Sequence, residues 1–205
     1  MITKEEHILL HAEKLFAEKG FEGSSTREIS KKAKVNVSMI SYYFGSKEKL
    51  FIKIFELRMD ESLAFSKDIL ANQHLNEWEK LISVVNRYAD RVKNLKTFYR
   101  ILQREQLNNK NPHISEFLIK SKKGFLAIYS ELFAKGFENK IFTKRPRIEF
   151  IHSTVSGTVF TALNTLPVYK DFFNGDEAYE DQYFEELKLH IQNILKHLLG
   201  YEENL

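Results

Sequence analysis

Residues 25–49 read STREISKKAKVNVSMISYYFGSKEK, and this stretch predicts the fold of the N-terminal part of the chain. Ser25 can cap a short helix, because Glu28 lies three residues on and can reach back to the backbone N–H of the cap. Asn36 can cap a second short helix that ends near Phe44. Two short helices joined by a tight turn, with a third helix opening at the final SKEK, are typical of a helix-turn-helix.

The second short helix is expected to face outward with polar and aromatic side chains, because Ile40 and Phe44 share its inner face. Residues 26–49 contain six lysines and arginines against two glutamates, so this segment carries a charge of +4 in a chain whose net charge is +3. A short exposed helix among positive charges fits the major groove of DNA. On charge alone, a solvated basic surface remains the alternative.

The rest of the chain is expected to be helical, because apolar residues keep a helical spacing and only three prolines and eight glycines interrupt them. We expect an all-α fold of about nine helices. Residues 1–46 would form a three-helix DNA-binding domain with the helix-turn-helix, and residues 47–205 a second helical domain.

Composition narrows the remaining classes of protein. The chain has no cysteine, which excludes disulfides, thiolate zinc sites and a cysteine nucleophile. No apolar run approaches the roughly 20 residues that span a bilayer. The N-terminus carries acids and a histidine through its apolar positions, unlike a signal peptide. We therefore expect a cytoplasmic protein with no membrane partner.

Three fragments of residues 1–55 together resemble the tetracycline-repressor (TetR) family of bacterial transcriptional regulators. They are the Phe-x-x-x-Gly-Phe pattern of residues 16–21, the Arg-Glu-Ile of residues 27–29, and the aromatic cluster of residues 42–44 followed by Ser-Lys-Glu-x-Leu. The resemblance covers about a quarter of the chain. Two positions depart from the family pattern: Lys34 stands where the turn usually has glycine, and Ser41 where many members have a tyrosine that contacts DNA.

The expected DNA contacts lie on the two short helices and at the start of the next one. Val37 suits a thymine methyl group, and Lys47 is expected to clamp a phosphate, as the matching lysine does in the family. Packing in the small domain remains the alternative for Met39 and for the ring of Tyr43. The full set of expected DNA-binding residues is Thr26, Arg27, Val37, Ser38, Met39, Ser41, Tyr42, Tyr43 and Lys47.

The resemblance implies a homodimer that binds a palindromic operator in double-stranded DNA, usually as a repressor, and that a small-molecule effector releases. The last two helices are the expected dimer interface, although an intramolecular core would show the same apolar stripes. The expected interface residues are Val155, Gly157, Val159, Phe160, Leu187, Ile191, Ile194, Leu195 and Leu198. An apolar or aromatic effector would contact Trp78, Tyr88, Phe98, Phe125, Tyr129 and His152, unless these residues are plain core.

No enzymatic activity, catalytic residue, metal site or cofactor is expected, because no phosphate-binding loop, nucleophile motif or carboxylate pair is recognisable. His7 and His11 have a spacing that can bind a metal, but no third ligand accompanies them and a solvated helix face explains them. Two alternatives to the ligand-responsive regulator remain. One is an architectural or division-control DNA-binding protein of the same fold that answers to a protein partner. The second is a helical interaction module whose N-terminal domain no longer binds DNA.

Overall fold

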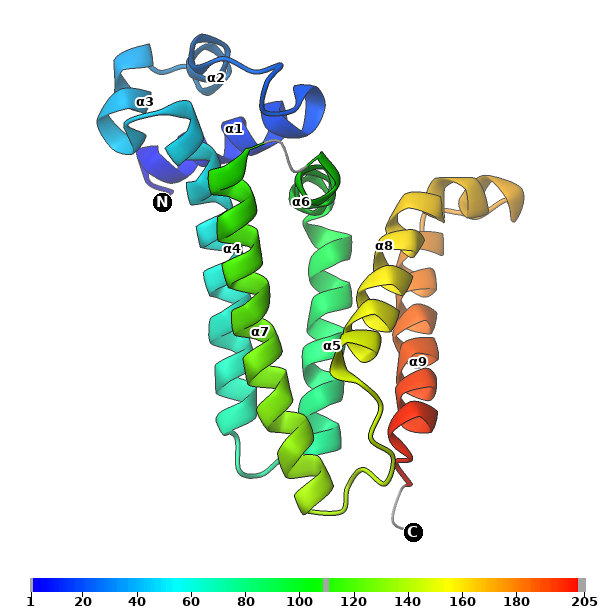
Figure 1. The fold of residues 1–205 in the computed structure, drawn as a ribbon. Helices are drawn as coiled ribbons and strands as arrows, with labels where there is room; N and C mark the ends of the chain where they lie inside the picture. The colour runs from blue at the N-terminus through cyan, green and yellow to red at the C-terminus, as the bar shows by residue number, and fades with distance from the viewer. Residues whose placement is uncertain (1, 109–110, 203–205) are drawn as a thin grey trace. The chain divides into compact units, whose positions relative to one another are not determined.

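The computed structural model describes residues 2–108 and 111–202, and within these residues it contains nine α-helices and no β-strand (Figure 1). The expected all-α fold is confirmed. The helices are α1 (Lys4–Lys19), α2 (Thr26–Ala33), α3 (Val37–Phe44), α4 (Lys47–Ala71), α5 (Glu77–Asn94), α6 (Lys96–Asn108), α7 (Pro112–Glu138), α8 (Ile148–Phe172) and α9 (Tyr179–Leu199).

Side-chain caps define the short helices as the sequence predicts. The Ser25 hydroxyl accepts a hydrogen bond from the Glu28 backbone N–H at 3.2 Å, and the Glu28 carboxylate accepts one from the Ser25 N–H at 3.1 Å. Asn36 caps α3 by accepting from the N–H of Ser38 at 2.9 Å. These bonds satisfy backbone donors that a helix leaves unpaired in its first turn. The helix boundaries in this region therefore follow from local sequence.

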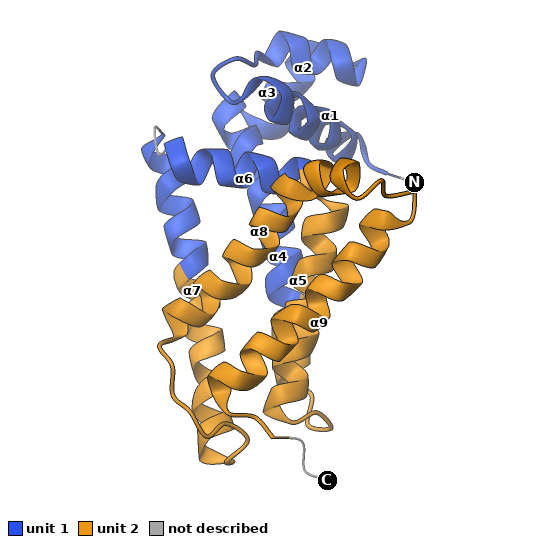
Figure 2. Cartoon of the chain, turned by 90° about the vertical axis from the view of Figure 1, so that its right-hand side faces the viewer, with its two compact units in different colours: residues 1–64, 97–122 blue, residues 65–96, 123–205 orange. Residues whose placement is uncertain are grey.

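The chain packs as two compact units (Figure 2). Unit 1 comprises residues 1–64 and 97–122, and unit 2 comprises residues 65–96 and 123–205. This division follows packing, whereas the expected boundary after residue 46 separates two functions. That functional boundary stays a prediction.

The core of unit 1 is aromatic and joins three helices. The ring centroids of Phe16 in α1 and Phe51 in α4 lie 4.7 Å apart, and those of Phe51 and Phe55 lie 5.0 Å apart. Phe55 in turn contacts Phe98 of α6 at 5.4 Å. All four side chains are buried. Burial of this apolar surface holds α1, α4 and α6 together.

In unit 2, α8 and α9 lie side by side and both pack against α5. The buried apolar residues of these three helices form its core. They include Val85, Ala89 and Val92 of α5, Val159, Leu163 and Leu166 of α8, and Leu187, Ile191 and Leu195 of α9.

The turn between α2 and α3 passes through Lys34, which adopts the left-handed conformation with φ 53° and ψ 43°. This is the position where the family usually has glycine. The N–H of Val35 donates to the carbonyl of Ser30 at 3.0 Å, and His7 of α1 hydrogen-bonds the carbonyl of Ala33 at 3.0 Å. These contacts hold the turn in a conformation that costs a residue with a Cβ atom about 1–2 kcal/mol.

We expect Lys34→Gly to be more stable than Lys34→Ala by about 1 kcal/mol. Both substitutions remove the ammonium group, but alanine keeps the Cβ atom that disfavours the left-handed conformation. Urea unfolding of the two variants, followed by circular dichroism, measures the difference. Equal stabilities would show that the left-handed turn carries no strain.

Candidate DNA-binding site

Helix α3 presents one buried face and one exposed face. Ile40 and Phe44 are buried beneath it, as the sequence predicts. Tyr42 is 82% exposed and is the most exposed of the large apolar and aromatic side chains in the described residues. The remaining exposed members of the expected contact set on this helix are Val37, Ser38, Ser41 and Tyr43.

The two tyrosines of α3 form an edge contact, with ring centroids 5.1 Å apart. The Tyr43 ring also lies 6.2 Å from Phe44, so it both borders the core and reaches the surface. Met39 is half-buried, which leaves it between a packing role and a surface role. The structure thus brings all the α3 candidates to one short helix, with different degrees of exposure.

Helix α2 contributes its first turn and a basic surface. Arg27 is exposed and Thr26 is half-buried at its start, beside unpaired backbone N–H groups that favour anions. The exposed lysines Lys31, Lys32 and Lys34 follow along and after the helix. Lys32 pairs with Glu18 of α1 at 2.6 Å. Arg27, Lys31 and Lys34 place positive charge beside the uncharged α3, and such charge attracts a phosphate backbone.

Glu28 is the one acid of this helix, and Lys19 of α1 offsets its charge at 2.5 Å. Hydrogen bonds from Lys19 and from Ser25 hold the pKa of Glu28 below its ordinary value of 4.5. At neutral pH the carboxylate is ionised, which strengthens its bonds to the cap. The capping box is therefore formed without leaving an uncompensated negative charge beside the basic surface.

Lys47, the expected phosphate clamp, makes contacts that the sequence did not suggest. Its ammonium group donates to the carbonyl of Phe21 at 2.9 Å and to that of Ser24 at 3.0 Å. It also lies 4.2 Å from the centroid of the Phe21 ring. An ammonium group has three N–H donors, so one remains for a phosphate.

Two further side-chain links in unit 1 were not predicted. Arg58 of α4 pairs with the buried Glu13 of α1 at 3.2 Å, and burial raises the pKa of this glutamate against the opposing effect of Arg58. Arg104 of α6 donates to carbonyls at the end of α1. The partners lie between 45 and 88 residues apart in the sequence, so no local pattern could reveal them.

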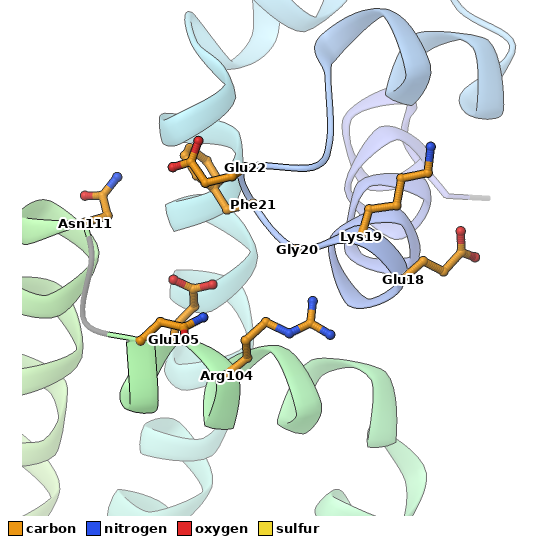
Figure 3. A pocket seen from close by; sticks show the side chains of 9 residues that line it. Glu18, Lys19, Gly20, Phe21, Glu22, Arg104, Glu105 and Asn111 are labelled. Carbon is orange, nitrogen blue, oxygen red and sulfur yellow. The ribbon is translucent and has the colours of Figure 1, made fainter.

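A depression of about 330 Å³ lies in unit 1 between the end of α1 and α6 (Figure 3). Its wall mixes acidic, basic, amide and aromatic side chains. The lining residues are Glu18, Lys19, Gly20, Phe21, Glu22, Arg104, Glu105, Asn108 and Asn111. None of the residues expected to contact the effector belongs to it.

The residues expected at a dimer interface divide into two groups. The side chains of Val159, Leu187, Ile191 and Leu195 are buried in the core of unit 2, as in the intramolecular alternative. The others are accessible to different extents: Val155, Phe160 and Ile194 are half-buried, and Gly157 and Leu198 are exposed.

The residues expected to contact an effector are also split. Phe98 belongs to the core of unit 1, and the Trp78 ring stacks on Tyr201 with centroids 4.4 Å apart. Phe125 and Tyr129 of α7 stack at 6.2 Å, and the Tyr129 hydroxyl lies 3.3 Å from that of Ser66. Tyr88 and His152 are half-buried in unit 2.

Two features of residues 2–108 and 111–202 bear on other kinds of site. No helix among them is long and apolar enough to cross a membrane. Within the same residues, no group of three or more His, Asp or Glu side chains could hold a metal ion.

Residues 8–54 match the sequence family described as bacterial regulatory proteins, tetR family. The chain is 53% identical over 51 residues to the HTH-type transcriptional repressor NicS of Pseudomonas putida, a match that covers 25% of this chain and 24% of NicS. It is 28% identical over 206 residues to the probable HTH-type transcriptional regulator YttP of Bacillus subtilis, covering 95% of each protein.

Solved structures agree with the fold. The crystal structure of the transcriptional regulator FadR from Bacillus subtilis in complex with stearoyl-CoA superposes with a TM-score of 0.71, at 18% identity, over 96% of this chain and 99% of that one. With the capped helix-turn-helix and its exposed α3 face, these matches show that the chain carries the DNA-binding domain of the tetR family of bacterial regulatory proteins.

Proposed function

We propose that this regulator is a repressor that binds a palindromic operator as a homodimer, with α3 in the major groove, and is released by a small-molecule effector. The observation that carries the proposal is the exposed face of α3, where Tyr42 projects from a helix whose other face is buried. NicS, which is 53% identical to this chain over 51 residues, is named as a transcriptional repressor. Action in the cytoplasm and the absence of enzymatic activity are parts of the same proposal.

The exposed residues of α3 read base edges in this proposal. Val37 contacts a thymine methyl group, and Ser38, Ser41 and Tyr42 supply hydrogen bonds. Thr26, Arg27, Tyr43 and the remaining N–H of Lys47 hold phosphates, and Met39 supports the helix from its half-buried position. Because Ser41 replaces a longer family side chain, Tyr42 carries a larger share of the readout.

We expect Tyr42→Ala to weaken operator binding about tenfold, which corresponds to 1.4 kcal/mol. Its stability should change by less than about 0.5 kcal/mol, because the side chain is exposed. Fluorescence anisotropy with an operator selected from random DNA by the wild-type protein measures the affinity. Tyr42→Phe keeps the ring and separates the hydroxyl contribution; wild-type affinity in Tyr42→Ala would remove this residue from the interface.

A homodimer is proposed because one reading helix spans too few base pairs for adequate specificity, and a second head about 34–36 Å away completes the site. The accessible faces of α8 and α9 support an interface there. A Cβ atom added to Gly157, in the middle of α8, would meet nothing within 4 Å. A glycine inside a helix lowers the stability of the helix by about 1 kcal/mol relative to alanine. Contacts within the chain do not require glycine at this position, whereas close approach of a partner helix would.

The proposed interface is formed by the exposed and half-buried members of the expected set, while the buried ones support them from the core. It extends to neighbouring exposed residues on the same faces. Together these are Phe150, Ser153, Val155, Gly157, Phe160 and Thr161 of α8, and Ile194 and Leu198 of α9.

We expect Gly157→Leu to convert the dimer to a monomer and to abolish high-affinity operator binding. A Cβ atom added at Gly157 has nothing of its own chain within 4 Å, whereas a leucine side chain there would separate two closely packed helices. Gly124→Leu is the matched control, because Gly124 is also exposed within a helix and has nothing within 4 Å of an added Cβ. Light scattering after gel filtration gives the mass of each variant; a dimeric Gly157→Leu protein would place the interface elsewhere.

An apolar or aromatic effector in unit 2 completes the proposal. Phe125, Tyr129, Tyr88 and His152 would contact it. The Tyr129 hydroxyl lies 3.3 Å from that of Ser66, so this pair would border the ligand. The related fold of Bacillus subtilis FadR binds stearoyl-CoA, which suggests long-chain acyl compounds as a first class of ligand. The proposed contacts omit Phe98, which is buried in unit 1, and Trp78, which stacks on Tyr201.

We expect an acyl-CoA of suitable chain length to release the operator, and Tyr129→Ala to reduce that response without changing DNA affinity in the absence of ligand. A titration of the protein–operator complex with acyl-CoAs of increasing length measures both effects. Trp78→Ala is the control for a general change in unit 2. If DNA binding were intact but acyl and aromatic compounds had no effect, the alternative of an architectural or division-control protein that answers to a protein partner would be favoured.

A further inference from the structure

The turn between α1 and α2 is unusually tight. Gly20 ends α1 with φ 77°, and its N–H donates to the Phe16 carbonyl at 2.8 Å. A Cβ atom at Gly23 would lie 2.4 Å from the carbonyl oxygen of Lys19, so the chain folds directly back onto the end of the helix. The last carbonyls of a helix lack partners within it and accept hydrogen bonds from water or from other parts of the chain.

Arg104 of α6 supplies two further donors, one of them to the Phe16 carbonyl that also accepts from Gly20. Its two terminal nitrogens donate to the carbonyls of Phe16 at 3.2 Å and Ala17 at 3.1 Å. Figure 3 shows its side chain reaching from α6 towards the end of α1 and Gly20. A positive charge at this end of a helix also complements the helix dipole. The side chain is half-buried and its bonds are charge-assisted, so it is a specific link between the two helices.

A continuous series of contacts leads from this link to the start of α2. The Ser24 hydroxyl donates to the carbonyl of Gly20 at 2.7 Å, and Lys47 donates to the carbonyl of Ser24 at 3.0 Å. Ser25, the next residue, caps α2. The position of the α1–α2 turn therefore sets where α2 begins and how its first turn, with Thr26 and Arg27, is presented.

The immediate surroundings of Arg104 separate it from the residues proposed to contact phosphate. It lines the depression of unit 1 together with Glu22 and Glu105. Burial raises the pKa of Glu105, Arg104 opposes that rise, and Glu22 adds to it. The charge of Arg104 is thus engaged by helix carbonyls and neighbouring carboxyl groups.

We propose that Arg104 is a positioning residue for DNA binding. By donating hydrogen bonds from α6 to the last turn of α1, it holds the α1–α2 turn in the conformation that places α2 and α3 on DNA. It acts through the turn and makes no contact with DNA. This inference concerns the DNA-binding activity alone and does not depend on the nature of the effector.

The test compares Arg104→Met with Arg100→Met, on the operator that the wild-type protein selects. Arg100 is an exposed arginine one turn earlier in α6, so its substitution removes the same charge without the helix-capping bonds. We expect Arg104→Met to bind the operator about tenfold more weakly and Arg100→Met to bind as the wild type does. Arg104→Lys, which keeps a cationic donor, should recover part of the loss.

The salt dependence of binding distinguishes positioning from direct contact. Loss of one phosphate contact lowers the slope of log K against log salt by about one, as expected for Lys47→Met. We expect the slope of Arg104→Met to equal that of the wild type. Hydrogen exchange should become faster in residues 16–24 and stay unchanged in α9.

Unchanged affinity in Arg104→Met, or a slope lowered as in Lys47→Met, would overturn the inference. If Arg104→Met failed to fold, the same comparison would be made with Arg104→Lys, in which a loss of affinity without a change of slope supports the inference and wild-type affinity refutes it. A wild-type protein that selects no DNA sequence would instead refute the proposed operator binding.

Discussion

The conformation of the three N-terminal helices, α1 to α3, depends on which groups donate hydrogen bonds to the backbone carbonyls of the α1–α2 turn. A helix ends with carbonyls that have no partner inside it, and buried ones must find donors elsewhere. Here Arg104 reaches the last turn of α1, while Lys47 reaches the carbonyls of Phe21 and Ser24. Two cationic side chains from two other helices therefore tether the segment of residues 16–25, which includes the six residues that connect α1 to α2.

Unit 1 extends beyond the helix-turn-helix because side chains of α4 and α6 pack against α1. Rings of α1, α4 and α6 pack in series from Phe16 to Phe98, and the Glu13–Arg58 pair adds a polar link between α1 and α4. Taking two charges out of water is costly, and the raised pKa of Glu13 reflects that cost. The three reading helices are thus packed as one body with the start of α4 and with α6.

In unit 2, α8 and α9 have apolar or small residues both in the core and on the accessible surface. Ile191 and Leu195 of α9 are completely buried within the chain, whereas Leu198 on the same helix is exposed. On α8, Val159 is buried and Gly157 opens onto free space. A helix with core contacts on one side and small or apolar residues on the other is suited to a second helix layer, which is the physical basis of the proposed homodimer.

The sequence by itself determined the all-α class, the capped helices α2 and α3 and the inner face of α3, because these follow from interactions between residues two to four positions apart. It also marked Lys34 as unusual, but the left-handed geometry became evident only in the structure. Tertiary structure alone decided which side chains close the α1–α2 turn, which interface candidates are buried, and that Phe98 lies in a different unit from Phe125 and Tyr129. The physical reason is that local spacing shows which side of a helix is apolar or basic, whereas the residues that this side contacts belong to helices distant in the chain.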